Sequence, residues 1–193
     1  MEALRTIKNE HRSIAAVLHG MQYFVREIGE RDEKPNFEVF GAMIYYLDAF
    51  PERFHHPKED AYLFKKLRER CPDALPLILR LQNEHVLGAE KIRKLEQALT
   101  RYSQGGASEF ANFAAAVEDY ASFHWAHMRA EESELLPLAV AHFSAADWAT
   151  VDAAFAQHDD PLAGMETATD PTSLFRRIVN LAPPPIGVGA EVE

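Results

Sequence analysis

The stretch FHWAHMRAE at residues 123–131 decides how the rest of the chain is interpreted. His127 and Glu131 are four residues apart, so on an α-helix they lie one above the other on a single face. Around them the same face carries residues at three- and four-residue spacing, namely Phe110, Phe113, Val117, Tyr120, His124, Leu135 and Leu138. The stretch therefore predicts one long helix, from an N-cap at Ser108 to about residue 141, with a histidine and a carboxylate on its buried face.

The two halves of the chain repeat this polar pattern. Each half contains an Asn-Glu-His triplet, then a His-x-x-x-Glu motif with a second acid directly after it. The members in the first half are Asn9, Glu10, His11, His55, Glu59 and Asp60. Those in the second half are Asn83, Glu84, His85, His127, Glu131 and Glu132. We interpret the pattern as a duplicated helix pair whose copies share the polar residues of their inner faces.

Apolar residues at helical spacing predict three further long helices. The first covers about residues 4–28 and has His11 in its apolar stripe. The second runs from residue 37 to about Pro51 and restarts at Pro57, with an interruption near His55 and His56. The third covers about residues 73–102 and ends at 103–106, and His85 lies in its stripe.

These patterns predict an all-α protein with a single main domain. We expect an antiparallel up-down-up-down four-helix bundle over residues 1–143. A helical appendage follows at 144–182, with one short helix from Ser144 to about residue 157 and another at 170–181. The proline- and glycine-rich end at 183–193 is expected to be a disordered tail.

Composition excludes several classes of protein. The 193 residues are 47% hydrophobic and 26% charged, which suits one sizeable core. A net charge of −10 repels phosphate backbones and anionic lipid, so we expect no nucleic-acid and no membrane partner. The single cysteine, Cys71, excludes a disulfide framework and thiolate metal clusters. The first ten residues lack the apolar core of a secretory signal, and we expect a cytoplasmic location.

Six inward-facing polar residues need compensation in an apolar core. An unpaired buried polar group costs on the order of 2 kcal/mol, and a bare charge costs far more. Two His-x-x-x-Glu pairs and one histidine from each remaining helix suit a pair of divalent metals bridged by carboxylates. Iron, manganese and zinc are all compatible with imidazole and carboxylate donors. The candidate ligands are His11, His55, Glu59, His85, His127 and Glu131.

Other assignments of these residues stay open. The four histidines could instead be core residues that bond to carbonyl or carboxylate groups, and the two glutamates could form ion pairs on the helix surface. His56 and His124 are further candidates, either as ligands or as residues that orient ligands. Glu10 and Glu84 are expected to face solvent or to accept hydrogen bonds from ligands. A ferritin-like site is excluded, because it needs Glu-x-x-His on two helices.

The six residues, with the strings at residues 54–59 and 123–131, resemble the hemerythrin family, in particular the bacterial proteins with the HHE cation-binding pattern. The resemblance covers about residues 1–143. It implies a non-haem diiron site in a four-helix bundle, with both iron ions bridged by Glu59 and Glu131. It also implies that His11 and His55 bind one iron, and that His85 and His127 bind the other.

The chain departs from the oxygen-carrying hemerythrins in two ways. Those proteins have a second histidine four residues after the ligand of the third helix, where this chain has Ala89, and a His-x-x-x-x-Asp motif on the last helix. Fewer histidines leave more open metal positions, which favours water, peroxide or nitric oxide chemistry over reversible oxygen carriage.

We therefore expect a protein that binds or senses O2, NO or peroxide, or that handles iron. One alternative is a diiron enzyme, either a hydroperoxidase or a repair factor for iron–sulfur proteins. Another is a redox-inert metal, such as zinc, that only stabilises the bundle. The expected partner is a small diatomic or peroxide ligand, and the oligomeric state stays open, with a homodimer among the alternatives.

Overall fold

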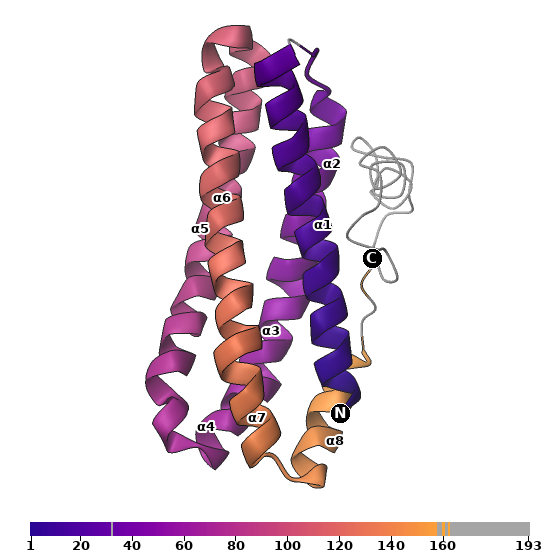
Figure 1. Ribbon diagram of the computed structural model, residues 1–193, viewed down its shortest axis with the longest axis vertical. Coiled ribbons are helices and arrows are strands. Elements are labelled where there is room, and N and C mark those ends of the chain that lie inside the picture. Colours follow the sequence, from indigo (N-terminus) through magenta and orange to yellow (C-terminus); the bar gives the residue numbers. More distant parts are fainter. Residues whose placement is uncertain (32, 158–159, 161, 163–193) are drawn as a thin grey trace.

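The computed structural model describes residues 1–31, 33–157, 160 and 162. In this part of the chain, four long helical rods pack together, each antiparallel to the next along the sequence, and no strand occurs (Figure 1). The first rod is α1, Glu2–Arg31, and the third is α5, Leu75–Gly105. The bundle is the expected one, and its first helix extends a few residues beyond the predicted limits at both ends.

The second rod is continuous, and the interruption predicted near His55 and His56 is a change of helix type rather than a break. Its elements are α2 (Phe37–Leu47), η1 (Asp48–His55), α3 (His56–Lys58), η2 (Glu59–Phe64) and α4 (Lys65–Arg70). A proline in an α-helix lacks the amide for its hydrogen bond and clashes with the carbonyl four residues earlier. Here η1 and η2 are π-helical, and the amide of His56 bonds to the carbonyl of Pro51, five residues earlier. Pro51 lies inside the wider turns of η1, and Pro57 follows them at the start of α3, so neither proline ends the rod.

The fourth rod begins later than the sequence predicted. It consists of α6 (Phe110–Ala130), η5 (Glu131–Leu135) and α7 (Leu136–His142). The predicted N-cap is wrong, because the Ser108 hydroxyl donates to the carbonyl of Gly105 within the short 3-10 turn η4, Gly106–Glu109. The third helix also runs on to Gly105, where Gly106 with a φ of 66° ends it in a conformation that glycine tolerates.

Both His-x-x-x-Glu motifs end at the first residue of a π-helical turn, η2 at Glu59 and η5 at Glu131. The repeat seen in the sequence is therefore also a repeat of backbone conformation. A π turn inserts one extra residue and rotates the next part of the helix relative to a regular α-helix. Such turns are frequent at functional sites, and here each begins at a glutamate that faces the bundle interior.

The core is divided into two apolar clusters with polar residues between them. One cluster includes Phe40, Met43, Leu95 and Phe113, and the other includes Leu63, Leu67, Leu81, Leu135 and Val151. On the first three rods the inward-facing histidines and glutamates fall in the sequence interval between the two clusters. On the fourth rod they lie around the boundary, where His127 precedes Met128 of the first cluster and Glu131 follows Ala130 of the second. Charged groups there are surrounded by apolar material, which strengthens every electrostatic interaction among them.

The appendage begins with α8, Ala145–Phe155, which packs beside α1 near the N-terminus (Figure 1). The Ser144 side chain accepts from the Asp147 amide, and the Asp147 carboxylate accepts from the Ser144 amide, which is the reciprocal capping box. Arg70 of α4 donates two further hydrogen bonds to Asp147. The second predicted short helix, 170–181, and the predicted tail, 183–193, lie outside the described residues.

Within the part of the chain that the structure describes, no helix combines the length and the apolar character that crossing a membrane requires. The long helices are amphipathic instead, with one apolar face directed into the bundle.

Candidate metal centre

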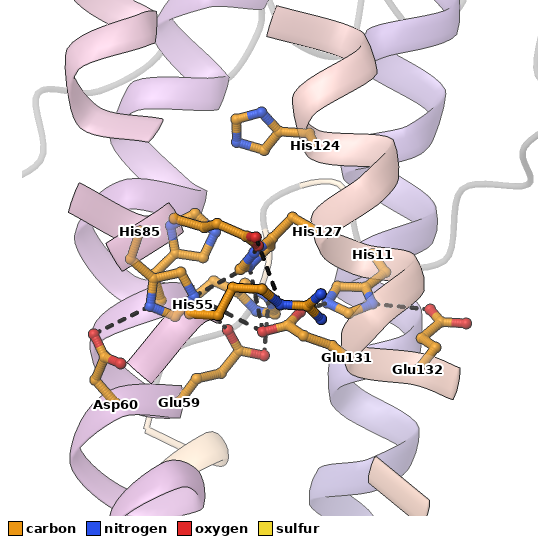
Figure 2. A network of polar contacts seen from close by, with 12 residues as sticks. His11, His55, Glu59, Asp60, His85, His124, His127, Glu131 and Glu132 are labelled. Atoms are coloured by element: carbon orange, nitrogen blue, oxygen red, sulfur yellow. Dashed lines mark hydrogen bonds and ion pairs between the residues drawn. The ribbon is translucent and has the colours of Figure 1, made fainter. Parts of the chain in front are cut away.

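The structure brings the six predicted ligand residues together in the middle of the bundle, and each is at most 7% exposed. Each rod supplies at least one side chain, as Figure 2 shows. The contributions are His11 from α1, His55 and Glu59 from the second rod, His85 from α5, and His127 and Glu131 from the fourth. Sequence reasoning therefore identified a spatial cluster from periodicity and the repeat.

The donor atoms form two groups that share the glutamates. His11, His55, Glu59 and Glu131 offer ligand atoms that all lie within 4.8 Å of one another, and so do Glu59, His85, His127 and Glu131. The Nε2 atoms of His85 and His127 are 3.1 Å apart, and Glu131 Oε1 is 3.3 Å from the latter. On the other side, Glu131 Oε2 lies 3.2 Å from His11 Nε2. Glu59 lies between the sides in the same way, 3.4 Å from His55 Nε2 and 3.6 Å from His85 Nε2.

Several inward-facing atoms have no hydrogen bond. Among the described residues, both carboxylate oxygens of Glu59, both of Glu131 and the Nε2 of His11 are buried without such a partner. Buried polar groups in native proteins are nearly always satisfied, and each exception needs an explanation. Carboxylate oxygens and imidazole nitrogens that converge on one region are the donor set that divalent cations bind. The residues present therefore fit a pair of metal ions.

Each of the four histidines is fixed from outside by a carboxylate. The pairs, by Nδ1 to oxygen distance, are His11 with Glu132 at 2.8 Å, His55 with Glu10 at 2.6 Å, His85 with Asp60 at 3.1 Å and His127 with Glu84 at 2.8 Å. The pairing is cyclic, because the acid on each rod supports the histidine on the next rod and the fourth rod supports the first. We call these four acids the outer carboxylates.

The outer carboxylates select the histidine tautomer. A carboxylate accepts a hydrogen bond from Nδ1–H, which leaves the lone pair on Nε2. In each of the four rings Nε2 is the atom directed at Glu59 or Glu131. The same support raises the basicity of a ligand and fixes its orientation in known metal sites.

Burial and the neighbouring charges shift the pKa values of the ionisable side chains in the centre. Burial, together with the nearby Glu131, raises the pKa of Glu59 well above 4.5. Burial also acts to raise the pKa of Glu131, but its contacts with His127 and His11 outweigh this and hold that pKa well below 4.5. His127 is the converse case, because burial lowers its pKa while Glu131 and Glu84 raise it to about 9. Without a cation, protons on histidine compensate the carboxylates.

The His55 side is sealed more completely than the others. Glu10 is 1% exposed and bonds to the buried Lys58, whose Nζ lies 3.2 Å from Glu10 Oε1. The same ammonium lies 4.8 Å from the ring centroid of Phe155 in α8. Burial raises the pKa of Glu10 to about 7 although Lys58 opposes the shift. Sequence reasoning missed Lys58 entirely, since nothing in the pattern shows that α8 covers it.

His56 and His124 lie beside the centre rather than between the two glutamates. His56 offers a nitrogen within 4.8 Å of those of His85 and His127, and all three rings are buried. His124 Nδ1 lies 3.1 Å from the Tyr120 carbonyl, and its Nε2 lies 3.7 Å from Glu52 Oε1. Glu52 was not among the candidates, because its only sequence signal is a single Glu-x-x-His spacing without a second copy.

A hollow of about 480 Å³ opens between α1 and the fourth rod, on the outer side of the centre. His11 and Glu132 form part of its wall, with Trp125, Met128 and two arginines, Arg12 and Arg129. His11 connects this wall with the centre, because its Nε2 lies 3.2 Å from Glu131 Oε2.

Comparison with known proteins agrees with this geometry. Residues 2–139 match the family model described as the hemerythrin HHE cation-binding domain. The match covers all four rods up to the middle of α7 and leaves out α8. Comparison with curated proteins and with solved structures found no significant match. The chain belongs to the hemerythrin HHE cation-binding domain family.

Proposed function

We propose that the protein holds a carboxylate-bridged pair of iron ions and uses them to bind or sense a small ligand such as O2, NO or peroxide. His11 and His55 would bind one ion and His85 and His127 the other, with Glu59 and Glu131 shared. The observation that carries the proposal is the pair of four-residue groups with two members in common. The unpartnered oxygens of both glutamates support it.

This donor set leaves room for an exogenous ligand. Two imidazoles and two shared carboxylates give each ion four protein donors, fewer than the six that octahedral ions such as manganese and magnesium take. Bound iron would supply Lewis acidity and one-electron redox chemistry at these open positions. The protein's own residues orient the imidazoles through the outer carboxylates and keep bulk water out with the two apolar clusters. The hollow beside His11 offers a route of approach on one side.

The first test is metal content. Untagged protein is expressed with iron and zinc both available, purified without chelators and analysed for metal per chain. We expect close to two irons per chain, and an absorption change on exposure to O2, NO or peroxide. Glu131→Gln should lose the pair, whereas His142→Gln, a change at an exposed histidine outside the cluster, should retain it.

The outcomes separate the candidate functions. Iron pairs that respond to NO or peroxide without turnover support binding or sensing, whereas catalytic loss of peroxide supports the hydroperoxidase alternative. Zinc, or metal whose removal changes only the thermal stability, would contradict the proposal and leave a structural metal site. We further propose a cytoplasmic location, because the single cysteine provides no disulfide framework.

A further inference from the structure

The hollow between α1 and the fourth rod is larger than the proposed small ligands need. Its volume is about 480 Å³, which is the size of pockets that bind small organic molecules. Its walls come from one short stretch of each rod, residues 11–15 of α1 and 125–133 of the fourth. The hollow therefore has space for a ligand much larger than O2, NO or peroxide.

Two arginines line the hollow from opposite rods, Arg12 from α1 and Arg129 from α6. Both side chains are exposed, and neither guanidinium forms a hydrogen bond or an ion pair with any residue that the structure describes. A guanidinium presents a planar set of N–H donors that matches a carboxylate or a phosphate. Two of them at one hollow, in a chain with a net charge of −10, make this a local site for an anion.

The acid in the wall does not cancel this charge. Glu132 is a single carboxylate beside two arginines, and its Oε1 already lies 2.8 Å from His11 Nδ1. A second hollow, of about 430 Å³, lies farther along the same two rods and has the opposite balance. Its wall contains one arginine, Arg26, with two acids, Glu30 and Glu118. Of these two hollows, the one beside the centre suits an anion and the other does not.

The remaining wall suits a flat apolar group. Trp125 offers an indole ring that is supported by His19 of α1, with ring centroids 4.5 Å apart. Met128 is 6% exposed and adds a polarisable thioether, which makes favourable contacts with aromatic rings. The other wall residues, Ala15 and Ser133, are small and leave the space between the rods open. Planar groups pack well against such an aromatic wall.

We propose that this hollow binds a small organic anion, namely a carboxylate with a planar apolar part. Arg12 and Arg129 bind the carboxylate, and Trp125 contacts the planar part. The site is built from the protein's own side chains, so it does not depend on the proposed iron pair. Since His11 belongs to the same wall, the bound anion lies beside the centre.

The test uses the full chain after chelator treatment, with benzoate as the probe. Titration calorimetry measures the affinity, and tryptophan fluorescence locates the site. Trp125 is partly exposed at the hollow, whereas the other tryptophan, Trp148, is buried beside Phe143. Benzoate should bind saturably at millimolar concentrations and change the emission of Trp125. Benzamide has a similar shape without the charge and should bind at least about 10-fold more weakly.

The first variants remove the positive charges. Arg12→Gln and Arg129→Gln should each weaken benzoate binding by about 3- to 10-fold, since each removes one charge-assisted contact at an exposed position. Arg26→Gln is the matched control, because it removes the same charge from the second hollow on the same helix. Its affinity for benzoate should equal that of wild type.

A second pair of variants tests the space and keeps both arginines. Ala15→Leu places a larger side chain in the wall of the hollow, and leucine is a good helix former. It should abolish benzoate binding while circular dichroism shows unchanged helix content. Ala114→Leu is its control, because it adds the same bulk to the wall of the second hollow. It should bind benzoate as wild type does.

Four results would overturn the inference. Two of them are the absence of saturable benzoate binding and equal binding of benzamide, since both mean that the hollow does not select an anion. Equal weakening by Arg12→Gln and Arg26→Gln would show that only the overall charge matters. Inorganic phosphate that binds as tightly as benzoate would show that the apolar wall contributes nothing. The proposed function is decided separately by metal content, so protein that binds benzoate but takes up no iron contradicts only that function.

Discussion

Replacing Glu59 with methionine should stabilise the metal-free protein while removing its ability to hold a metal pair. Glu59 is 0% exposed, and neither of its oxygens has a hydrogen bond to any described residue. Methionine is unbranched, apolar and of similar length, so it fills the same space without a polar atom that needs a partner. The change therefore removes a cost that only a bound cation offsets.

The size of the expected stability gain follows from the burial of the Glu59 carboxyl group. Leaving a buried polar group unsatisfied costs about 1–3 kcal/mol, so the free energy of unfolding of the metal-free variant should rise by about that amount at pH 7. The gain should depend on pH. Since the folded-state pKa of Glu59 lies well above 4.5, the part of this cost that comes from ionisation is absent below pH 4.5 and grows as the pH rises above that value. The stability difference between variant and wild type should therefore shrink toward pH 4.

The assay is denaturant unfolding of chelator-treated protein, followed by circular dichroism and analysed by linear extrapolation. Glu10→Met is the matched control, because Glu10 is equally buried but bonds to His55 Nδ1 at 2.6 Å and Lys58 Nζ at 3.2 Å. Its replacement leaves Lys58 without that carboxylate and should lower stability by about 1–3 kcal/mol. Two replacements of buried glutamate by methionine in one core should thus have opposite signs.

Added iron should affect the stability of wild type and of Glu59→Met differently. Iron should raise the unfolding midpoint of wild type by mass action and leave that of Glu59→Met nearly unchanged. A metal-free Glu59→Met protein that is as stable as wild type, or less stable, would refute the reasoning. It would mean that Glu59 is satisfied in the absence of a cation.

Three further predictions concern protons and the outer carboxylates. Glu84→Gln and Glu132→Gln should each lower metal affinity by about 10- to 100-fold in chelator competition, because each removes the carboxylate that orients a ligand histidine; equal affinities in wild type and variants would exclude this role. Metal binding at pH 7 should release protons, since the pKa of His127 is raised to about 9 and that ring must lose its proton to bind. Calorimetry in two buffers of different protonation enthalpy measures the release, and identical heats would contradict it. Hydrogen bonds from Arg70 and Ser144 lower the pKa of Asp147 below 3.8. Asp147→Asn should therefore be less stable than wild type at pH 7, and this deficit should shrink as the pH falls below about 3.8, where the carboxylate protonates; a deficit that persists in acid would point to another cause.

The fold could be predicted because its signals are local. Helix positions follow from apolar spacing along one segment, and the His-x-x-x-Glu pairs lie on one face for the same geometric reason. The predictions that were wrong concern hydrogen bonds at single turns. Ser108 bonds to Gly105 rather than capping α6, and the second rod continues past Pro51 in a π turn and past Pro57 in α3 without a break.

The sequence indicated the outer carboxylates but not which histidine each of them supports. Glu10 and Glu84 stood out because the Asn-Glu-His triplet repeats, and the acids after Glu59 and Glu131 matched between the halves. Which histidine each acid supports depends on the neighbouring rod, and spacing along one helix does not contain that information. The cyclic pairing became clear only when the four rods were placed side by side.

The sequence by itself determined a four-helix protein with a duplicated set of inward histidines and glutamates, because periodicity and repetition are properties of one chain segment at a time. Tertiary structure alone decided the surroundings of Lys58, Glu52 and Gly88. Lys58 is buried beside Phe155 of α8, and Glu52 lies 3.4 Å from His56 and close to Gly88 on another rod. Contacts between segments far apart in sequence depend on how the helices pack, and packing is fixed only by the complete core.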